Sequence, residues 1–335
     1  MAEPIRHGGN LREAAHRYDI ALGDWLDLST GINPRAYPVP PVPMDAWRRL
    51  PEDGDGLAEL AARHYGAPAA LPVAGSQAAI RALPGLFQPG VAAVAPLTYS
   101  EYAPAFERAG HRIVGLDAAS SKLNDDIDYV IVANPNNPAT DLIARDVLLH
   151  WHKQLAARGG TLIVDEAFAD AYGDAATSLA SESGREGLVV LRSVGKFYGL
   201  AGIRAGFVLA AAPLRDALSE TLGAWTVSGP ARHAVQAAFA DLSWQAETRS
   251  TLARDSARLA TLVRNQGFDS HATPLFVWFE TDQAAALQHA LATRGIWTRL
   301  FERGALPSLR IGLTGSQEEW ARFEEAFKAS VATIR

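Results

Sequence analysis

Residues 188–204 read LVVLRSVGKFYGLAGIR, an apolar run followed by a loop that carries one lysine between two glycines. The LVVL run predicts a buried strand. Lys196 follows this strand, and Gly195 and Gly199 allow other groups to approach the backbone closely. A lysine taken alone is usually a surface residue, but Arg204 comes eight residues later and offers a planar fork suited to phosphate. The stretch therefore predicts a lysine that can form a Schiff base beside an anion site.

A second strand ends in an acidic residue. Residues 161–168 read TLIVDEAF, so Asp165 comes at the carboxyl end of a buried run. In an open α/β sheet this edge is where ligands bind. An acid there can ligate a metal, cap a helix or pair with a pyridinium nitrogen. The lysine at a neighbouring strand end favours the third role, because a pyridoxal phosphate site needs both groups.

Three further segments add polar and aromatic groups after predicted strands. A Gly-Ser-Gln at 75–77 precedes helix formers, so a helix start presents N–H groups to a phosphate. Tyr99 follows another strand and can stack on a planar ring. Asn137, in the Asn-Pro-Asn-Asn-Pro of residues 134–138, can donate to a phenolate oxygen. Taken singly, the same segments are also typical of an N-cap, a packing aromatic and a turn.

Composition narrows the function classes. The 335 residues are 48% hydrophobic and 20% charged, as in ordinary globular proteins. The absence of cysteine excludes disulfide frameworks, zinc–thiolate clusters and thiol catalysis, and we expect no metal at the site. A net charge of −6 makes nucleic acid an unexpected partner. No apolar run approaches the ~20 residues of a membrane span and the first residues are charged, which predicts no membrane partner and a cytoplasmic location.

The order of apolar runs predicts an α/β protein with three parts. Residues 1–55, which contain a proline cluster, are expected to form an irregular arm. Residues 56–230 alternate short β-branched runs with amphipathic stretches, which indicates a large domain with a mainly parallel sheet. Residues 231–335 begin with a long helical stretch and continue as a smaller α+β domain. The expected strands are 91–95, 129–133, 161–164, 189–192, 205–209, 276–280, 297–301 and 309–312.

Taken in order along the chain, these motifs resemble those of fold-type I pyridoxal-phosphate enzymes of the aspartate-aminotransferase superfamily, on the histidinol-phosphate-aminotransferase branch. The resemblance implies a three-layer fold, pyridoxal 5'-phosphate as cofactor and a homodimer whose arm crosses the subunit interface. It implies Lys196 as the Schiff-base lysine, Asp165 at the pyridine nitrogen, Asn137 at the ring hydroxyl oxygen and Tyr99 stacked on the ring. The residues that it places around the cofactor phosphate are Gly75, Ser76, Gln77, Ser193 and Arg204.

The start of the chain bears on the reaction. His-Gly-Gly-Asn at 7–10, followed by Leu-Ser-Thr-Gly-Ile-Asn-Pro at 28–34, is similar to the threonine-phosphate decarboxylases of cobalamin biosynthesis. The resemblance implies decarboxylation of O-phospho-L-threonine to (R)-1-amino-2-propanol O-phosphate. A histidine, an asparagine and an arginine are residues suited to binding a phosphate dianion. The residues expected to bind this phosphorylated amino acid are His7, Gly8, Asn33, Arg299 and Arg310.

Two other functions stay open at this level. An aminotransferase for histidinol phosphate or an aromatic amino acid would use the same cofactor and Lys196. A non-catalytic domain of the same fold would serve as a binding partner. The sequence also departs from the pattern of the branch: Phe168 stands where a tyrosine is frequent, so a contact to the ring oxygen should be missing. Leu50-Pro51-Glu52 stands where a Tyr-Pro-Asp element of the arm is expected.

Overall fold

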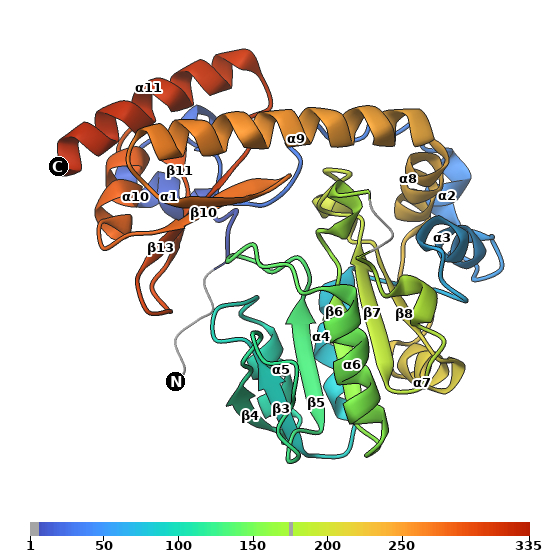
Figure 1. The fold of residues 1–335 in the computed structure, drawn as a ribbon. Helices are drawn as coiled ribbons and strands as arrows, with labels where there is room; N and C mark the ends of the chain where they lie inside the picture. Colours follow the sequence, from blue (N-terminus) through green and yellow to red (C-terminus); the bar gives the residue numbers. More distant parts are fainter. Residues whose placement is uncertain (1–6, 174–176) are drawn as a thin grey trace. The chain divides into compact units, whose positions relative to one another are not determined.

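The computed structural model describes residues 7–173 and 177–335, so the first six residues of the predicted arm lie outside the described chain (Figure 1). The chain divides into two compact units. The large unit comprises residues 36–137 and 141–246. The small unit comprises the chain up to Arg35, residues 138–140 and residues 247–335. The domain boundaries at residues 55 and 230 stay predictions.

The large unit is built on a seven-stranded sheet in the order β2-β8-β7-β6-β5-β3-β4. Strands β4, β3, β5, β6 and β7 run parallel, whereas β8 and β2 are antiparallel to their neighbours. The mainly parallel α/β sheet expected from the sequence is thus confirmed. Its strands are β2 Leu71–Val73, β3 Val91–Val94, β4 Arg112–Gly115, β5 Tyr129–Ala133, β6 Thr161–Asp165, β7 Leu188–Ser193 and β8 Gly206–Ala210.

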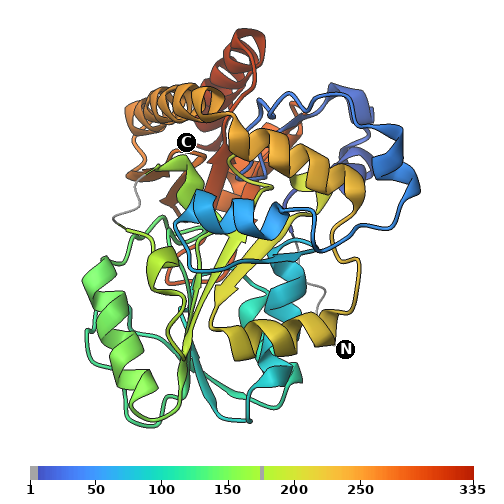
Figure 2. The ribbon, with the colours of Figure 1, turned by 90° about the vertical axis from the view of Figure 1, so that its right-hand side faces the viewer.

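Helices cover both faces of this sheet, which makes three layers. Figure 2 shows α6 on one side of the strands and α4 and α7 on the other. Helix α6 buries Leu148, Trp151 and Leu155, three apolar residues at helical spacing. The opposite face packs Ile80, Phe106 and side chains of the strands into one core. The helices are α2 Met44–Arg48, α3 Leu57–Tyr65, α4 Ser76–Ala82, α5 Tyr102–Arg108, α6 Arg145–Ala156, α7 Ala212–Leu222 and α8 Gly229–Ala240.

The small unit combines a four-stranded antiparallel sheet, β12-β13-β10-β9, with a two-stranded parallel pair, β1-β11. The pair joins the N-terminal segment to the C-terminal part of the chain, because Leu26 and Asp27 lie opposite Ile296 and Trp297. Its helices are α1 Leu11–Tyr18, the greater part of α9 Leu242–Asn265, α10 Ala284–Ala292 and α11 Gln317–Ile334. Its strands are β1 Leu26–Asp27, β9 Ser270–Thr273, β10 Phe276–Glu280, β11 Ile296–Trp297, β12 Arg299–Phe301 and β13 Ser308–Gly312.

Three elements differ from the sequence prediction. The single helical stretch expected over 231–265 is two helices, α8 and α9, separated at Asp241, whose carboxylate accepts the N–H of Trp244. The strand expected over 297–301 is interrupted at Thr298. The arm is not irregular throughout, because α1 forms before the proline cluster, with a Glu13–Arg17 ion pair of 2.8 Å on its surface. None of the described helices is both long enough and apolar enough to cross a membrane.

Candidate functional site

The carboxyl ends of neighbouring parallel strands bring the predicted cofactor residues of the large unit to one edge. Ala133, the last residue of β5, lies opposite Asp165 of β6, which lies opposite Leu191 of β7. Beyond the strands, the N–H of Asn134 donates to the carbonyl of Asp165 over 2.9 Å, and the N–H of Glu166 donates to the carbonyl of Leu191 over 2.9 Å. The loops that carry Asn137 and Lys196 therefore start beside Asp165, the last residue of β6.

Asp165 is a buried carboxylate held by two donors. Only 5% of the residue is exposed. The hydroxyl of Tyr102 donates to one oxygen over 2.8 Å and the N–H of Ala167 donates to the other over 3.0 Å. Burial raises the pKa of Asp165, while Tyr102, Ala167 and the charge of Lys196 act in the opposite direction. The two donors thus fix the carboxylate in place and favour its ionised form.

Replacing Tyr102 with phenylalanine should narrow the active pH range from the acid side. Without the hydroxyl, the pKa of Asp165 rises further, so the carboxylate becomes protonated at a higher pH. A hydrogen bond to a charged group of about 1.5 kcal/mol corresponds to roughly one pH unit. The acid limb of the pH profile of kcat/KM should move up by about this amount. Tyr172→Phe, at an exposed tyrosine of the same unit, is the control, and an acid limb that stays in place in Tyr102→Phe would refute the role of the hydroxyl.

Lys196 lies in a half-exposed position between buried neighbours. Val194 and Phe197 are fully buried and anchor the loop on both sides of the lysine. The amine of Lys196 lies 5.6 Å from the centre of the Phe168 ring, within the range of a cation–π contact. Phe168 places an aromatic face beside the amine where the resemblance implies a hydroxyl.

A glycine and an arginine meet at the start of α4. Gly75 has a φ of +76°, and a Cβ at this position would lie 2.8 Å from the guanidinium of Arg204. A side chain at residue 75 would therefore displace the arginine. Arg204 also donates to the carbonyl of Ala201 over 3.1 Å, and the hydroxyl of Ser193 accepts the N–H of Gly195 over 3.3 Å. A guanidinium next to the first N–H groups of a helix is a suitable arrangement for a phosphate.

Gln77 connects two side chains of the next loop. Its amide N–H donates to Glu101 over 2.8 Å, and its carbonyl oxygen accepts the hydroxyl of Tyr99 over 2.9 Å. Burial, and then the charge of Glu101, raise the pKa of Tyr99 to about 12, so the hydroxyl keeps its proton at neutral pH. The side chain of Gln77 thus fixes the ring of Tyr99. Its direct contact with a phosphate stays a prediction.

The loop of Asn137 is held by its neighbour Asn136. The amide of Asn136 donates to the carbonyl of Leu97 over 2.9 Å, and its oxygen accepts from the hydroxyl of Thr98 and the N–H of Asn137. The loops after β3 and β5 are therefore tied together, which brings the segments of Tyr99 and Asn137 to the same part of the sheet edge. The role of Asn137 toward a ring oxygen stays a prediction.

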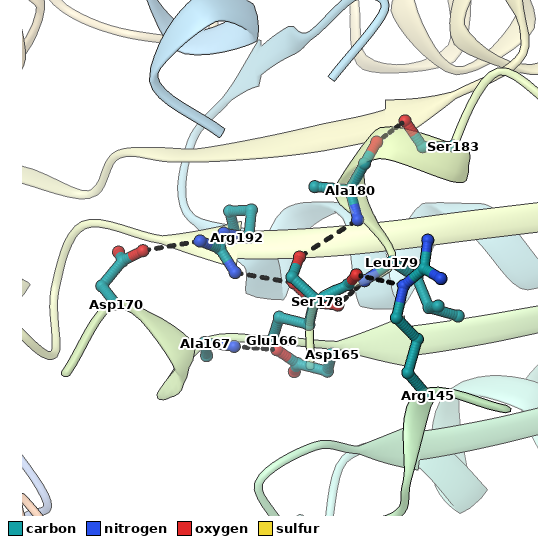
Figure 3. Close-up of polar contacts among 10 residues, drawn as sticks. All are labelled: Arg145, Asp165, Glu166, Ala167, Asp170, Ser178, Leu179, Ala180, Ser183 and Arg192. Carbon is teal, nitrogen blue, oxygen red and sulfur yellow. Dashed lines mark hydrogen bonds and ion pairs between the residues drawn. The ribbon is translucent and has the colours of Figure 1, made fainter. Parts of the chain in front are cut away.

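Behind Asp165 lies a buried ion cluster (Figure 3). Arg192, at the end of β7, contacts Glu166 over 2.6 Å and Asp170 over 2.7 Å, and all three side chains are almost fully buried. Glu166 also accepts the hydroxyl of Ser178 over 2.5 Å and the N–H of Leu179 over 2.7 Å. Burial alone would lower the pKa of Arg192, but the two carboxylates raise it, so the arginine is charged. The cluster binds the loop after Asp165 to the strand that leads to Lys196.

The small unit brings two of the predicted substrate residues together. Arg299 of β12 and Arg310 of β13 lie directly opposite each other in the antiparallel pair. Both guanidiniums lie near the ring of Phe301, at 5.1 Å and 5.8 Å from its centre. Burial, and then the charge of Arg299, lower the pKa of Arg310 to about 9, while Asp27 acts in the opposite direction. Like charges in register repel each other, so this pair favours a bound anion.

The other predicted substrate residues belong to the N-terminal part of the same unit. His7 is exposed and Gly8 packs against the backbone of Ser29. Asn33 is buried, and its side-chain oxygen accepts the N–H of Arg35 over 2.9 Å, which closes a turn. Their contacts with a substrate stay predictions.

Several residues at these sites are missing from the sequence prediction. Tyr102 follows Tyr99 by one helical turn, a spacing that places two tyrosines on the same side of a helix start. Glu166 and Arg192 directly follow and precede predicted site residues, but only the pairing of β6 with β7 shows that they meet. The hydroxyl of Ser29 accepts the N–H of Gly9, a contact between residues 20 positions apart for which the sequence holds no local signal.

The chain is similar to known proteins over nearly its whole length. A family model for aminotransferase class I and II matches residues 53–327. The chain is 48% identical over 325 residues to a threonine-phosphate decarboxylase of Pseudomonas aeruginosa, covering 96% of this chain and 97% of the relative. It is 40% identical to one of a Sinorhizobium species, covering 93% and 94%. Among solved structures, a histidinol-phosphate aminotransferase of Sinorhizobium meliloti in complex with pyridoxal-5'-phosphate has a TM-score of 0.82 at 19% identity, covering 100% and 96%.

Proposed function

The chain belongs to the class I and II aminotransferase family, and from this we propose that it is a pyridoxal-phosphate-dependent enzyme that decarboxylates O-phospho-L-threonine. Relatives with 48% and 40% identity over almost the whole chain carry the name threonine-phosphate decarboxylase. Loss of the carboxylate from this substrate leaves the phosphate ester of 1-amino-2-propanol. We assign the bond-breaking chemistry to the large unit and substrate recognition to the small unit.

The residues of the large unit fit pyridoxal phosphate. Gly75 leaves the space that a Cβ would fill beside Arg204, and this position suits the cofactor phosphate. Asp165 is a buried carboxylate of fixed orientation, as a pyridinium nitrogen requires. Lys196 supplies the amine, with Phe168 beside it. We assign Ser76, Gln77 and Ser193 to the phosphate, and Tyr99 and Asn137 to the ring.

Each residue has a defined task in the reaction. When bound, the cofactor supplies a ring that accepts the electron pair released at the substrate Cα. Asp165 holds positive charge at the ring nitrogen, and Tyr102 keeps the carboxylate in position. The bond from Cα to the carboxylate breaks, carbon dioxide leaves, and Lys196 gives a proton to Cα. Phe168 lies beside the amine, and the buried residues next to Lys196 hold its loop in place.

The cross-strand pair of Arg299 and Arg310 is the observation that carries the substrate assignment. A phosphorylated amino acid has two anionic groups, a carboxylate and a phosphate, and the pair offers one guanidinium for each. The low pKa of Arg310 reflects burial and the neighbouring cation, so an anion stabilises its charged form. We assign the carboxylate to Arg310 and the phosphate to Arg299.

A comparison of two substrates tests the proposed function. The enzyme with cofactor is incubated with O-phospho-L-threonine alone, and in parallel with histidinol phosphate and 2-oxoglutarate. We expect carbon dioxide release from the first and little turnover of the second. No carbon dioxide, together with rapid transfer of the amino group from histidinol phosphate, would identify an aminotransferase. A protein that takes up no cofactor and stays colourless would identify a binding domain.

Replacing Arg299 with leucine should weaken recognition of the phosphate. A charge-assisted hydrogen bond contributes about 1.5–3 kcal/mol, so KM for O-phospho-L-threonine should rise roughly 10- to 100-fold with a smaller change in kcat. The readout is steady-state kinetics of carbon dioxide release. Arg303→Leu removes an exposed arginine two residues after β12 and should leave KM within about twofold. Equal effects of the two variants would refute a specific role for Arg299.

We also infer a homodimer in the cytoplasm. Met44 and Trp47 of α2 and the following Leu50 are 63–66% exposed, which is unusual for three large apolar residues of one short segment. A second copy of the chain that covers this segment would remove them from water. Sedimentation of the enzyme with its cofactor tests the dimer, and fractionation of cells tests the location.

A further inference from the structure

The N-terminal segment of residues 7–9 is held by one serine of the small unit. The N–H of Gly9 donates to the hydroxyl oxygen of Ser29 over 2.7 Å. The hydroxyl of Ser29 donates in turn to the carboxylate of Asp27 over 2.6 Å. The same carboxylate oxygen accepts the N–H of Ser29 over 2.9 Å. Because a serine hydroxyl has one proton, its donation to Asp27 leaves the oxygen to accept from Gly9, and the chain of bonds has a fixed direction.

Ser29 also holds Arg310. The guanidinium of Arg310 donates to the carbonyl of Ser29 over 2.6 Å, and Ser29 itself is fully buried. The charge of Asp27 favours the charged form of Arg310 against the effects of burial and Arg299. One residue therefore fixes an arginine of the substrate pair through its carbonyl and the N-terminal segment through its hydroxyl.

The N-terminal segment is shaped for this contact. A Cβ on Gly8 would lie 2.4 Å from the carbonyl oxygen of Ser29, the atom that Arg310 contacts. Gly9 has a φ of +81°, a conformation that residues with a side chain rarely adopt. The two glycines thus allow the backbone to lie against Ser29 and place His7 at the end of a fixed segment.

We propose that Asp27 and Ser29 form a clasp that docks residues 7–9 next to Arg310, and that the docked segment contributes to recognition of the substrate's anionic groups by Arg310 and Arg299. Asp27 and Ser29 are positioning residues, because they act through Gly9 and Arg310. The inference rests on the proposed function for the identity of the substrate. It goes beyond that function by naming the residues that hold Arg310 and the N-terminal segment together.

The test has two readouts, hydrogen exchange of the Gly9 amide and the Kd of an anion. Both are measured in the enzyme with cofactor and without substrate. In Ser29→Ala, loss of the hydrogen bond should raise hydrogen exchange of the Gly9 amide at least about tenfold. Inorganic phosphate serves as the probe of anion binding at Arg310 and Arg299, and its Kd, measured by calorimetry, should rise about tenfold. Asp27→Asn keeps an acceptor oxygen but loses the charge, so its effects should lie between wild type and Ser29→Ala.

Ser256→Ala is the matched control. Ser256 is a buried serine of the same unit whose hydroxyl donates to the carbonyl of Thr273 over 2.6 Å. Its removal should change neither Gly9 exchange nor the phosphate Kd. Unchanged Gly9 exchange in Ser29→Ala, an unchanged phosphate Kd, or no phosphate binding by the wild type would each overturn the proposal. A wild type that binds phosphate and loses this in Ser29→Ala, yet releases no carbon dioxide from O-phospho-L-threonine, would sustain the clasp and reject the proposed decarboxylase function.

Discussion

Lys196→Ala should lower kcat for carbon dioxide release from O-phospho-L-threonine by at least about 10⁴-fold, because the proposed mechanism makes the lysine both the cofactor's covalent partner and the proton donor to Cα. Val194 and Phe197 are buried on either side, so the loop should keep its fold when the side chain is shortened. The measurement combines the rate of carbon dioxide release with the visible absorbance of the lysine-bound cofactor. Both should be lost in the variant.

Lys153→Ala provides the control for this prediction. Lys153 is exposed on α6, and its removal should change neither absorbance nor rate. If Lys196→Ala kept the wild-type absorbance or more than a small fraction of the rate, Lys196 would not be the catalytic lysine. In that case the assignment of the cofactor site in the large unit would have to be revised.

The second large effect is expected on the free energy of unfolding, when Arg192 of the buried ion cluster is replaced. Arg192→Met leaves Glu166 and Asp170 buried without the cation that both contact. Breaking a buried ion pair by removing one partner costs about 3–5 kcal/mol, since the remaining charge stays desolvated. The free energy of unfolding should fall by this amount in urea titrations. Because the cluster ties the loop after Asp165 to β7, the variant that still folds should also bind the cofactor more weakly.

Arg112→Met is the control for Arg192→Met, because it removes the cation of an exposed ion pair. Arg112 contacts Asp126 over 3.1 Å, but both side chains are about 60% exposed, and such pairs contribute little. Its unfolding curve should overlay that of the wild type. Equal stability of Arg192→Met and wild type would show that the buried cluster does not stabilise the fold.

The elements that the sequence predicts well are those with a strong local pattern. The strands over 129–133, 161–164 and 189–192 consist mostly of consecutive apolar residues, and the structure places all three in the centre of the parallel sheet. Once parallel neighbours are assumed, the carboxyl ends of these strands must meet at one edge. This is why the loops of Asp165 and Lys196 could be expected together.

The elements that the sequence does not reveal depend on contacts between distant segments. Tyr102 meets Asp165 across 63 residues, and Arg192 meets Glu166 across 26. Composition and periodicity describe single segments, so neither partner of such a pair carries a signal of the other. The break at Asp241 has a different cause, because it is a local event marked by one hydrogen bond within an otherwise helical pattern.

For the substrate residues, too, the sequence predicts the residues themselves but not the contacts between distant segments. Arg310 could be named from the resemblance and Arg299 from its charge, but their direct opposition follows from the register of β12 and β13. His7, Gly8 and Asn33 were assigned to the substrate from the start of the chain, while Ser29, which lies in the same motif at 28–34 and holds residues 7–9 in place, received no role. The small unit therefore adds to the sequence prediction the contacts that position Gly8, Asn33 and Arg310.

The central claim concerns the bond that breaks, and one measurement addresses it directly. O-phospho-L-threonine labelled with carbon-13 in the carboxyl group is incubated with the enzyme and 2-oxoglutarate in D₂O and followed by nuclear magnetic resonance. We expect the label to appear as dissolved carbon dioxide and bicarbonate, in equal amount with a product that carries one deuteron on the carbon that bore the carboxylate. A label that stays in an organic acid, with the amino group passed to 2-oxoglutarate, would contradict the proposed function.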